Sequence, residues 1–264
     1  MPLTLKLRDC TAPVDLFDLD LDALGGRPLK SIAAAPVLIG RRREALGEVF
    51  AASGKADGRW RFEGDLRRVD GMATGLRGAT VTADGPVGHR AGAQMRGGRL
   101  TLEADAGPWC GAAMRGGAIE VRGDAGDGLG AAYLGDTRGM RGGTIVVRGD
   151  AGSETGSLMR RGWIVVAGDC GPLAGYRMLA GTLMVLGRCG PHAGAEMRRG
   201  TLALLGGAAP LLPSFRHACR AEPTILRLMR HDLATLGVNA PAGQVDLWSG
   251  DLLKGGRGEV WLPA

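Results

Sequence analysis

Arginine recurs at one fixed place in a repeated stretch of this 264-residue sequence. A guanidinium group presents a planar fork of N–H donors that matches the two oxygens of a carboxylate or phosphate. Because equivalent positions of stacked strands lie in a line about 4.8 Å apart, the spacing predicts a ladder of sites for acidic groups. Its arginines are Arg77, Arg96, Arg115, Arg141, Arg160 and Arg198, and Leu179 occupies the equivalent place in one repeat.

Two interpretations of this ladder are open at the level of sequence. In the first, the arginines are solvated or paired with aspartates of the same chain. In the second, they form a track for a linear polyanion or for an acidic subunit. Nucleic acid is a poor candidate for the polyanion because aromatic residues, on which bases stack, make up only 4% of the chain. The candidate aspartates are Asp105, Asp124, Asp150 and Asp169.

Catalytic and metal-binding patterns do not occur in the sequence. The four histidines form no HxH or HExxH pattern, no serine lies in GxSxG, and no lysine follows a glycine-rich loop in the Walker arrangement. The five cysteines form no CxxC pair and follow no signal peptide, which favours reduced thiols in the cytoplasm. Cys170 and Cys189 hold equivalent places in neighbouring repeats, so we expect them to stack as packing residues. The sequence therefore predicts neither a catalytic site nor a metal.

The ladder belongs to seven repeats, here called rows, whose starts are separated by 19, 19, 26, 19, 19 and 19 residues. Most rows open with Met-Arg-Gly-Gly or a close variant. Aliphatic residues then alternate, as in Ile119 and Val121, which is typical of a strand with one buried face. Glycine returns twelve and sixteen residues after the start of each of the first six rows. The rows start at Leu76, Met95, Met114, Met140, Met159, Met178 and Met197.

A fixed period of this size is typical of stacked supersecondary units, none of which buries its apolar face alone. A short strand plus glycine corners leaves no room for a helix within a row. Glycine supplies the positive φ angles that tight corners need, and parallel crossovers are nearly always right-handed. The sequence therefore predicts an all-β fold, a single-stranded right-handed parallel β-helix of 19-residue coils, with an N-terminal cap and a C-terminal helix cap.

Three regions follow from the extent of the rows. Residues 1–56 are expected to cap the first coil, with an edge strand from Leu3 to Leu7. Residues 57–206 form the repeat domain, and the seven extra residues of one row emerge within 127–139 as a loop on the binding face. Residues 207–264 are expected to cap the other end.

The details of the two caps are also predicted. In the N-terminal region, residues 13–26 are interpreted as a short helix or capping segment and not as a metal site, with their aspartates on a solvated face. Trp60 and Phe62 are interpreted as the strand of a degenerate first coil. In the C-terminal region, a helix from Thr224 to Leu236 is expected to cover the last coil, and Val260 to Leu262 adds a final strand. The aspartates are Asp15, Asp18, Asp20 and Asp22.

The composition supports an acidic partner outside a membrane. The net charge is +6, and it rests on arginine because Lys6, Lys30, Lys55 and Lys254 are the only lysines. A basic surface attracts acidic partners, although a GC-rich genome that uses arginine in place of lysine explains the total equally well. No apolar run approaches the roughly 18 residues that a membrane span requires.

The repeat has the form G-x-x-M-R-G-G-x-I-x-V-x-G-D-x-G, and a lead-in from Leu46 to Gly54 precedes it. Over roughly residues 40–206 this pattern resembles the glycine-rich domain shared by the C subunit of formylmethanofuran dehydrogenase and the C-terminal domain of the glutamate synthase large chain. The sequence carries no amidotransferase or flavin-barrel region, which favours the C subunit. Its richness in arginine is more similar to the bacterial version, in the formyltransferase/hydrolase complex of methylotrophs.

The resemblance implies a cytoplasmic complex of one-carbon metabolism that oxidises formaldehyde to formate. It implies three partners: a formyltransferase subunit, an amidohydrolase-like zinc subunit and a further subunit. It also implies a furan-type carrier, methanofuran or its bacterial relative methylofuran, which has a glutamate tail. The subunit of this type carries no metal or catalytic base. Our own hypothesis is that the tail lies along Arg96, Arg115, Arg141, Arg160 and Arg198.

Other classes of function were weighed against this one. A self-sufficient enzyme such as a polysaccharide lyase requires clustered carboxylates and a base on one face, and neither is visible. A structural domain like that of glutamate synthase, or an independent polyanion-binding assembly module, remains as the alternative to the scaffold subunit.

Overall fold

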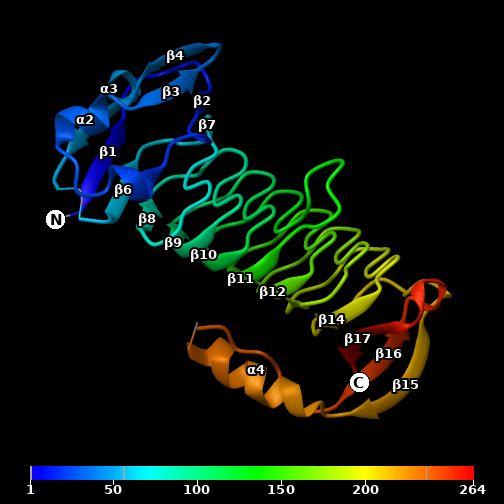
Figure 1. The fold of residues 1–264 in the computed structure, drawn as a ribbon. Coiled ribbons are helices and arrows are strands. Elements are labelled where there is room, and N and C mark those ends of the chain that lie inside the picture. The colour runs from blue at the N-terminus through cyan, green and yellow to red at the C-terminus, as the bar shows by residue number, and fades with distance from the viewer. Residues whose placement is uncertain (1, 56, 236) are drawn as a thin grey trace.

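The computed structural model describes residues 2–55, 57–235 and 237–264 of the chain. The main element is one sheet of 13 strands, along which the rows follow one another (Figure 1). From one edge to the other its strands are β15 (Arg216–Ala221), β16 (Val245–Gly250), β17 (Arg257–Pro263), β14 (Arg199–Leu204), β13 (Thr182–Val185), β12 (Arg161–Val166), β11 (Arg141–Val147), β10 (Gly116–Val121), β9 (Arg96–Leu102), β8 (Thr80–Ala83), β6 (Arg59–Glu63), β1 (Leu3–Leu7) and β5 (Phe50–Ser53).

The prediction of an all-β fold in the form of a single-stranded right-handed parallel β-helix was wrong. The large sheet is mixed: β1–β5, β15–β16 and β16–β17 are antiparallel, although the strands of the rows pair in parallel. Short helices and a second sheet accompany it. The 19-residue period of the sequence predicts only how each row pairs with the next row. The antiparallel strands come from segments outside the rows, where no period exists to predict their pairing.

Neighbouring rows contact each other at several places. In the sheet, Ile119 lies opposite Leu100 on one side and Ile145 on the other. A second line of contacts consists of single-residue parallel bridges. The seven extra residues of one row leave both lines in register and form the projecting loop 127–139 (Figure 1). The bridges link Leu66, Val87, Ala106, Ala125, Ala151, Cys170, Cys189 and Ala208 in turn.

The predicted aspartates hold the backbone of adjacent rows together. Asp124 Oδ1 accepts the backbone N–H of Asp150 at 2.8 Å, and Asp150 Oδ1 accepts that of Asp169 at 2.7 Å. Asp105 and Asp169 make the same contact with the backbone N–H of the next row. A Cβ at Gly149 would collide with the Asp124 carboxylate, so glycine is required beside each such contact. These carboxylates therefore have a structural role in the turns.

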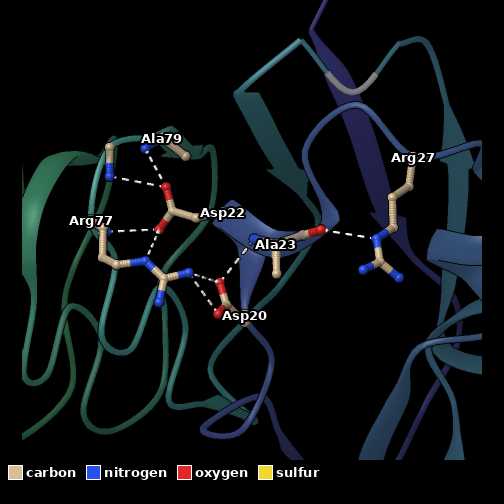
Figure 2. A network of polar contacts seen from close by, with 7 residues as sticks. Asp20, Asp22, Ala23, Arg27, Arg77 and Ala79 are labelled. Atoms are coloured by element: carbon tan, nitrogen blue, oxygen red, sulfur yellow. Dashed lines mark hydrogen bonds and ion pairs between the residues drawn. The ribbon is translucent and has the colours of Figure 1, made fainter.

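The first row is completed by a side chain from outside the rows (Figure 2). Elsewhere, the residues that follow a row start donate backbone N–H groups to the row before; for example, Arg96 N donates to Leu76 O at 2.7 Å. For the first row, the carboxylate of Asp22 takes the place of these backbone acceptors. It accepts the N–H groups of Arg77, Gly78 and Ala79 at 2.7, 2.9 and 2.8 Å.

Asp20 acts beside it on the same row. Its carboxylate pairs with the Arg77 guanidinium at 2.7 Å and accepts the backbone N–H of Ala23 at the start of α1 (Leu21–Leu24). Its pKa is lowered, chiefly by the bond from Ala23 and also by Arg77. The prediction that these aspartates are only solvated was therefore wrong for Asp20 and Asp22, and also for Asp15, which pairs with Arg90 at 2.9 Å.

The N-terminal elements gather at one end of the rows (Figure 1). The second sheet is formed there by β4 (Arg42–Ala45), β3 (Pro36–Ile39), β2 (Val14–Asp15) and β7 (Val69–Asp70), in that order. Helices α1, α2 (Leu29–Ala33) and α3 (Leu46–Val49) belong to the same end. Leu3–Leu7 is not an edge strand, because β1 pairs with both β5 and β6. Trp60 and Phe62 are fully buried on β6.

Helix α4 (Thr224–Thr235) lies along the outer face of the sheet instead of covering its last row (Figure 1). Its residues Leu226, Met229 and Leu233 are buried in a second apolar cluster. The sheet contributes outward-facing residues of four successive strands: Val146, Val165, Met184 and Ala203. Both faces of β11 to β14 are therefore buried. The predicted end of this helix at Leu236 lies outside the described residues.

We expect Val165→Thr to lower the free energy of unfolding by about 1–2 kcal/mol, because the new hydroxyl would be buried beneath α4 among apolar side chains. Val165 is only 1% exposed. The matched change is Thr101→Val on β9, which lies two rows beyond Val146 of the outer cluster and should alter the free energy by less than about 0.5 kcal/mol. Urea unfolding of both variants measures the difference. Equal effects would contradict the position of α4.

The last row is closed by strands from the C-terminal region. Strand β17 pairs in parallel with β14 and includes the predicted strand from Val260 to Leu262. Strands β16 and β15 then extend the sheet in antiparallel pairs. Phe215 packs into the main apolar core next to Gly250, where a Cβ would collide with its ring.

Asp246, on β16, is expected to make the stability of the protein depend on pH in the acid range. Its pKa falls from 3.8 to about 2, because Arg220 and His217 donate hydrogen bonds to the carboxylate. A lowered folded-state pKa stabilises the protein above the unfolded value of 3.8, and this stabilisation is lost as the pH falls through about 2. In urea unfolding from pH 6 to pH 2, Asp246→Asn should therefore lose less stability than the wild type between pH 4 and pH 2. Parallel curves would refute this assignment.

Candidate functional site: a basic groove

Backbone contacts place the predicted arginines in one line along the rows. Arg115 N donates to Met95 O at 2.7 Å, Arg160 N to Met140 O at 2.8 Å, and Arg198 N to Met178 O at 2.8 Å. Arg96 and Arg141 make the same bond, as does Leu179 in the row between Arg160 and Arg198. We call this line the arginine column. Successive members are therefore separated by about one strand spacing, 4.8 Å.

The column opens into a groove near the C-terminal end of the rows. The groove has a volume of about 880 Å³ and is lined by cations from two rows, from the start of β17 and from the segment before it. The described residues contribute no aspartate or glutamate to its lining. We call it the basic groove. Its charged residues are Arg160, Arg161, Arg198, Arg199, Lys254 and Arg257.

The hollow exists because one row lacks arginine. The rows that start at Met159 and Met197 each carry two consecutive arginines, whereas the row between them carries Leu179 and Ala180. These two smaller, uncharged residues, with Gly181, form part of the lining between the two arginine pairs. The pairs lie two strand spacings apart, roughly 10 Å. An elongated acidic molecule could therefore contact both pairs at once.

The charges of the groove are largely uncompensated. Within the described part of the chain, no ion pair is formed by Arg160, Arg161, Arg198, Arg199 or Arg257, and all five side chains are exposed. Lys254 is the exception, because its Nζ lies 3.3 Å from a carboxylate oxygen of Glu196. Like charges gathered in one groove repel each other and raise the local affinity for anions.

The hypothesis that internal aspartates neutralise the arginine column does not fit the structure. The aspartates bind backbone N–H groups of the next row, as described above. The other arginines near them pair with glutamates: Arg122 lies 2.7 Å from Glu103, and Arg148 lies 2.8 Å from Glu120. Arg77 is the one column residue, among those described, that pairs with aspartate, and its partners come from the N-terminal region.

The structure divides the five predicted site residues. Arg160 and Arg198 line the basic groove, whereas Arg96, Arg115 and Arg141 lie on the same column outside it. Arg141 is half-buried, and its Nε is buried without a hydrogen-bond partner among the described residues.

Sequence reasoning missed four cationic residues of the groove. Arg161 and Arg199 had a visible signal, because arginine replaces the first glycine of Met-Arg-Gly-Gly in these two rows. Lys254 and Arg257 come from outside the rows. Their position depends on the pairing of β17 with β14, which the row period does not encode.

The remaining reactive groups offer no second site of this kind. Among the described residues, no three His, Cys, Asp or Glu side chains are grouped so that they could hold a metal. All five cysteines are free, and burial raises the pKa of the Cys110 thiol to about 12. Cys170 and Cys189 are adjacent, as the sequence predicts, and their thiols contact each other. In the described residues, no helix is long and apolar enough to cross a membrane.

The fold and the groove define a class of protein: stacked β rows that carry a concentrated cationic surface. No protein-family model and no curated protein matches the chain. Among solved structures, it is similar to a chain in the crystal structure of the formyltransferase/hydrolase complex (FhcABCD) from Methylorubrum extorquens in complex with methylofuran. The identity is 37%, the TM-score is 0.91, and the match covers 99% of each chain.

This degree of identity over the whole of both chains shows a common family. The protein therefore belongs to the same family as that chain of the formyltransferase/hydrolase complex. The match does not extend to glutamate synthase, so the resemblance to that enzyme receives no support from it.

Proposed function

We propose that this chain is a subunit of a formyltransferase/hydrolase complex, that it corresponds to the C subunit, and that it acts as a scaffold without a catalytic site. The observation that carries the proposal is the 37% identity over 99% of both chains. Its partners are a formyltransferase subunit, an amidohydrolase-like zinc subunit and a further subunit. The complex passes a formyl group between carriers and releases formate during one-carbon metabolism in the cytoplasm. The free cysteines fit a reducing compartment.

The second part of the proposal concerns a furan-type carrier with an acidic tail. The related complex was crystallised with methylofuran. The basic groove fits a polycarboxylate, because its lining combines six cationic side chains with no carboxylate from the described residues. The glutamate tail of the carrier lies along the arginine column, over Arg96, Arg115, Arg141, Arg160 and Arg198, and is held most strongly at the groove. Guanidinium groups bind its carboxylates, and Leu179 and Ala180 leave space for the chain between them.

The regions outside the rows complete this picture. We propose that residues 1–56 and 207–264 close the two ends of the repeat domain 57–206 and so prevent its edge strands from pairing with other chains. The contact of Asp22 with the first row and the pairing of β17 with β14 support this division.

The test is affinity purification of the tagged full-length chain from its native host, followed by mass spectrometry of the proteins and small molecules retained. Recovery of a formyltransferase-like and an amidohydrolase-like subunit together with a glutamate-tailed furan compound is the expected result. Recovery of the chain without these subunits would refute the scaffold role and favour an independent polyanion-binding module.

A further inference from the structure

Two apolar loop tips are exposed among the described residues, in segments that line a hollow beside the basic groove. Loop 127–139 projects from the rows (Figure 1), and its residue Leu134 is 102% exposed. Leu253, in the short 3-10 helix η1 (Leu252–Lys254), is 81% exposed, and Leu252 beside it is 47% exposed. Single exposed leucines are common on protein surfaces. Apolar groups that share one surface, however, mark sites of protein association.

The two loops that carry these tips both contribute residues to the lining of the same hollow. This cavity has a volume of about 360 Å³ and adjoins the basic groove, with which it shares Leu179, Arg198 and Lys254. Loop 127–139 contributes Asp136, Thr137 and Arg138 to its lining, and η1 contributes Lys254. We call the hollow and its two apolar tips the two-loop surface.

The two-loop surface carries an excess of positive charge. Its lining contains Arg138, Arg177, Arg198 and Lys254 against Asp136 and Glu196. Glu196 is already engaged, because Arg177 lies 3.6 Å and Lys254 lies 3.3 Å from its carboxylate. In the described part of the chain, Arg138 and Arg198 form no ion pair. A partner that fits this surface must therefore have apolar pockets that receive the leucines. Between these pockets it must present carboxylates that pair with Arg138 and Arg198.

Both tips are held by internal contacts, so little order has to be gained on docking. The buried carboxylate of Asp251 accepts the backbone N–H of Leu253 at 3.0 Å and that of Glu196 at 3.1 Å. In loop 127–139, Asp136 N donates to Tyr133 O at 2.9 Å, and Gly139 N donates to Leu158 O at 2.9 Å. Preorganised surfaces lose less conformational entropy when they bind.

We propose that the two-loop surface docks another subunit of the complex through a face that has apolar pockets flanked by carboxylates. This inference rests on the proposed function, since it names the place where this chain meets such a partner. The partner then lies beside the basic groove and closes one end of it.

The test compares variants of the full-length chain for binding to the remaining subunits of the complex, prepared without it. Leu134→Ser/Leu253→Ser should weaken binding about 100-fold, and Arg138→Glu about tenfold, at an unchanged melting temperature. Leu228→Ser is the matched control, because Leu228 is 61% exposed on α4, outside this surface. It should bind like the wild type.

Each outcome decides a different claim. Wild-type affinity in the Leu134→Ser/Leu253→Ser and Arg138→Glu variants, or an equal loss in Leu228→Ser, would overturn the docking surface alone. Failure of the wild-type chain itself to bind the remaining subunits would overturn the proposed function and the docking surface together.

Discussion

In the assembled complex, reversal of four groove arginines to glutamate is expected to raise KM for the acidic-tailed carrier about 100-fold and to leave kcat unchanged. The variant is Arg160→Glu/Arg161→Glu/Arg198→Glu/Arg199→Glu. An exposed ion pair contributes about 0.5 kcal/mol, and reversal replaces this attraction with a repulsion of similar size. Four positions then amount to roughly 3–4 kcal/mol, which is 100-fold or more. Because the groove holds the tail and not the formyl group, the rate of the chemical step should not change.

Two controls separate tail binding from a general effect of charge. The triple reversal of Arg41, Arg42 and Arg43, in and beside β4 at the other end of the rows, should leave KM unchanged. A carrier without its glutamate tail should give the same KM with wild-type and groove-variant complexes. A fall in kcat at constant KM would contradict the proposed role of the groove and would favour a direct part in the chemistry.

The second large effect concerns stability. We expect Asp22→Ala to lower the free energy of unfolding by about 3 kcal/mol, because three backbone N–H groups of the first row would lose a charged acceptor. Figure 2 shows these groups at the Asp22 carboxylate, whereas the neighbouring Asp20 carboxylate is bound to the Arg77 side chain. Urea unfolding measures the change.

Two further variants define the cause of that loss. Asp22→Asn keeps one carbonyl oxygen in place of the carboxylate, so it should cost roughly half as much. Asp18→Ala removes an exposed carboxylate four residues away and should change the free energy by less than about 0.5 kcal/mol. If Asp22→Ala were as stable as Asp18→Ala, Asp22 would not be the acceptor that holds the start of the first row.

Local repetition made part of this structure predictable. Residues such as Ile119 and Ile145 lie opposite each other because equal positions of neighbouring rows pair, and the 26-residue step preserves this register. The same repetition placed the arginines in a column. The pairing of segments outside the rows was harder to predict, since their partners are distant in sequence and follow no period. The wrong fold class arose there, at the antiparallel strands β5, β15 and β16.

Two signals were present in the sequence but were not used. The outward-facing residue of each row changes from Thr101 and Glu120 to Val146 and Val165, which is the sign of a covered face. It could have placed helix α4 on the sheet instead of at its end. In the same way, the doubled arginines at Arg160 and Arg161 mark the basic groove. Lys254 and Arg257 had no such signal, because only the tertiary pairing of β17 brings them there.

The most direct test of the central claim is calorimetric titration of the full-length chain with a linear glutamate oligomer at low and high ionic strength. We predict binding that weakens steeply as salt screens the groove and that is lost when Arg160, Arg161, Arg198 and Arg199 are reversed. The triple variant at Arg41, Arg42 and Arg43 should still bind. Absence of binding at low salt, or equal binding by the groove variant, would contradict the claim that this groove holds an acidic carrier.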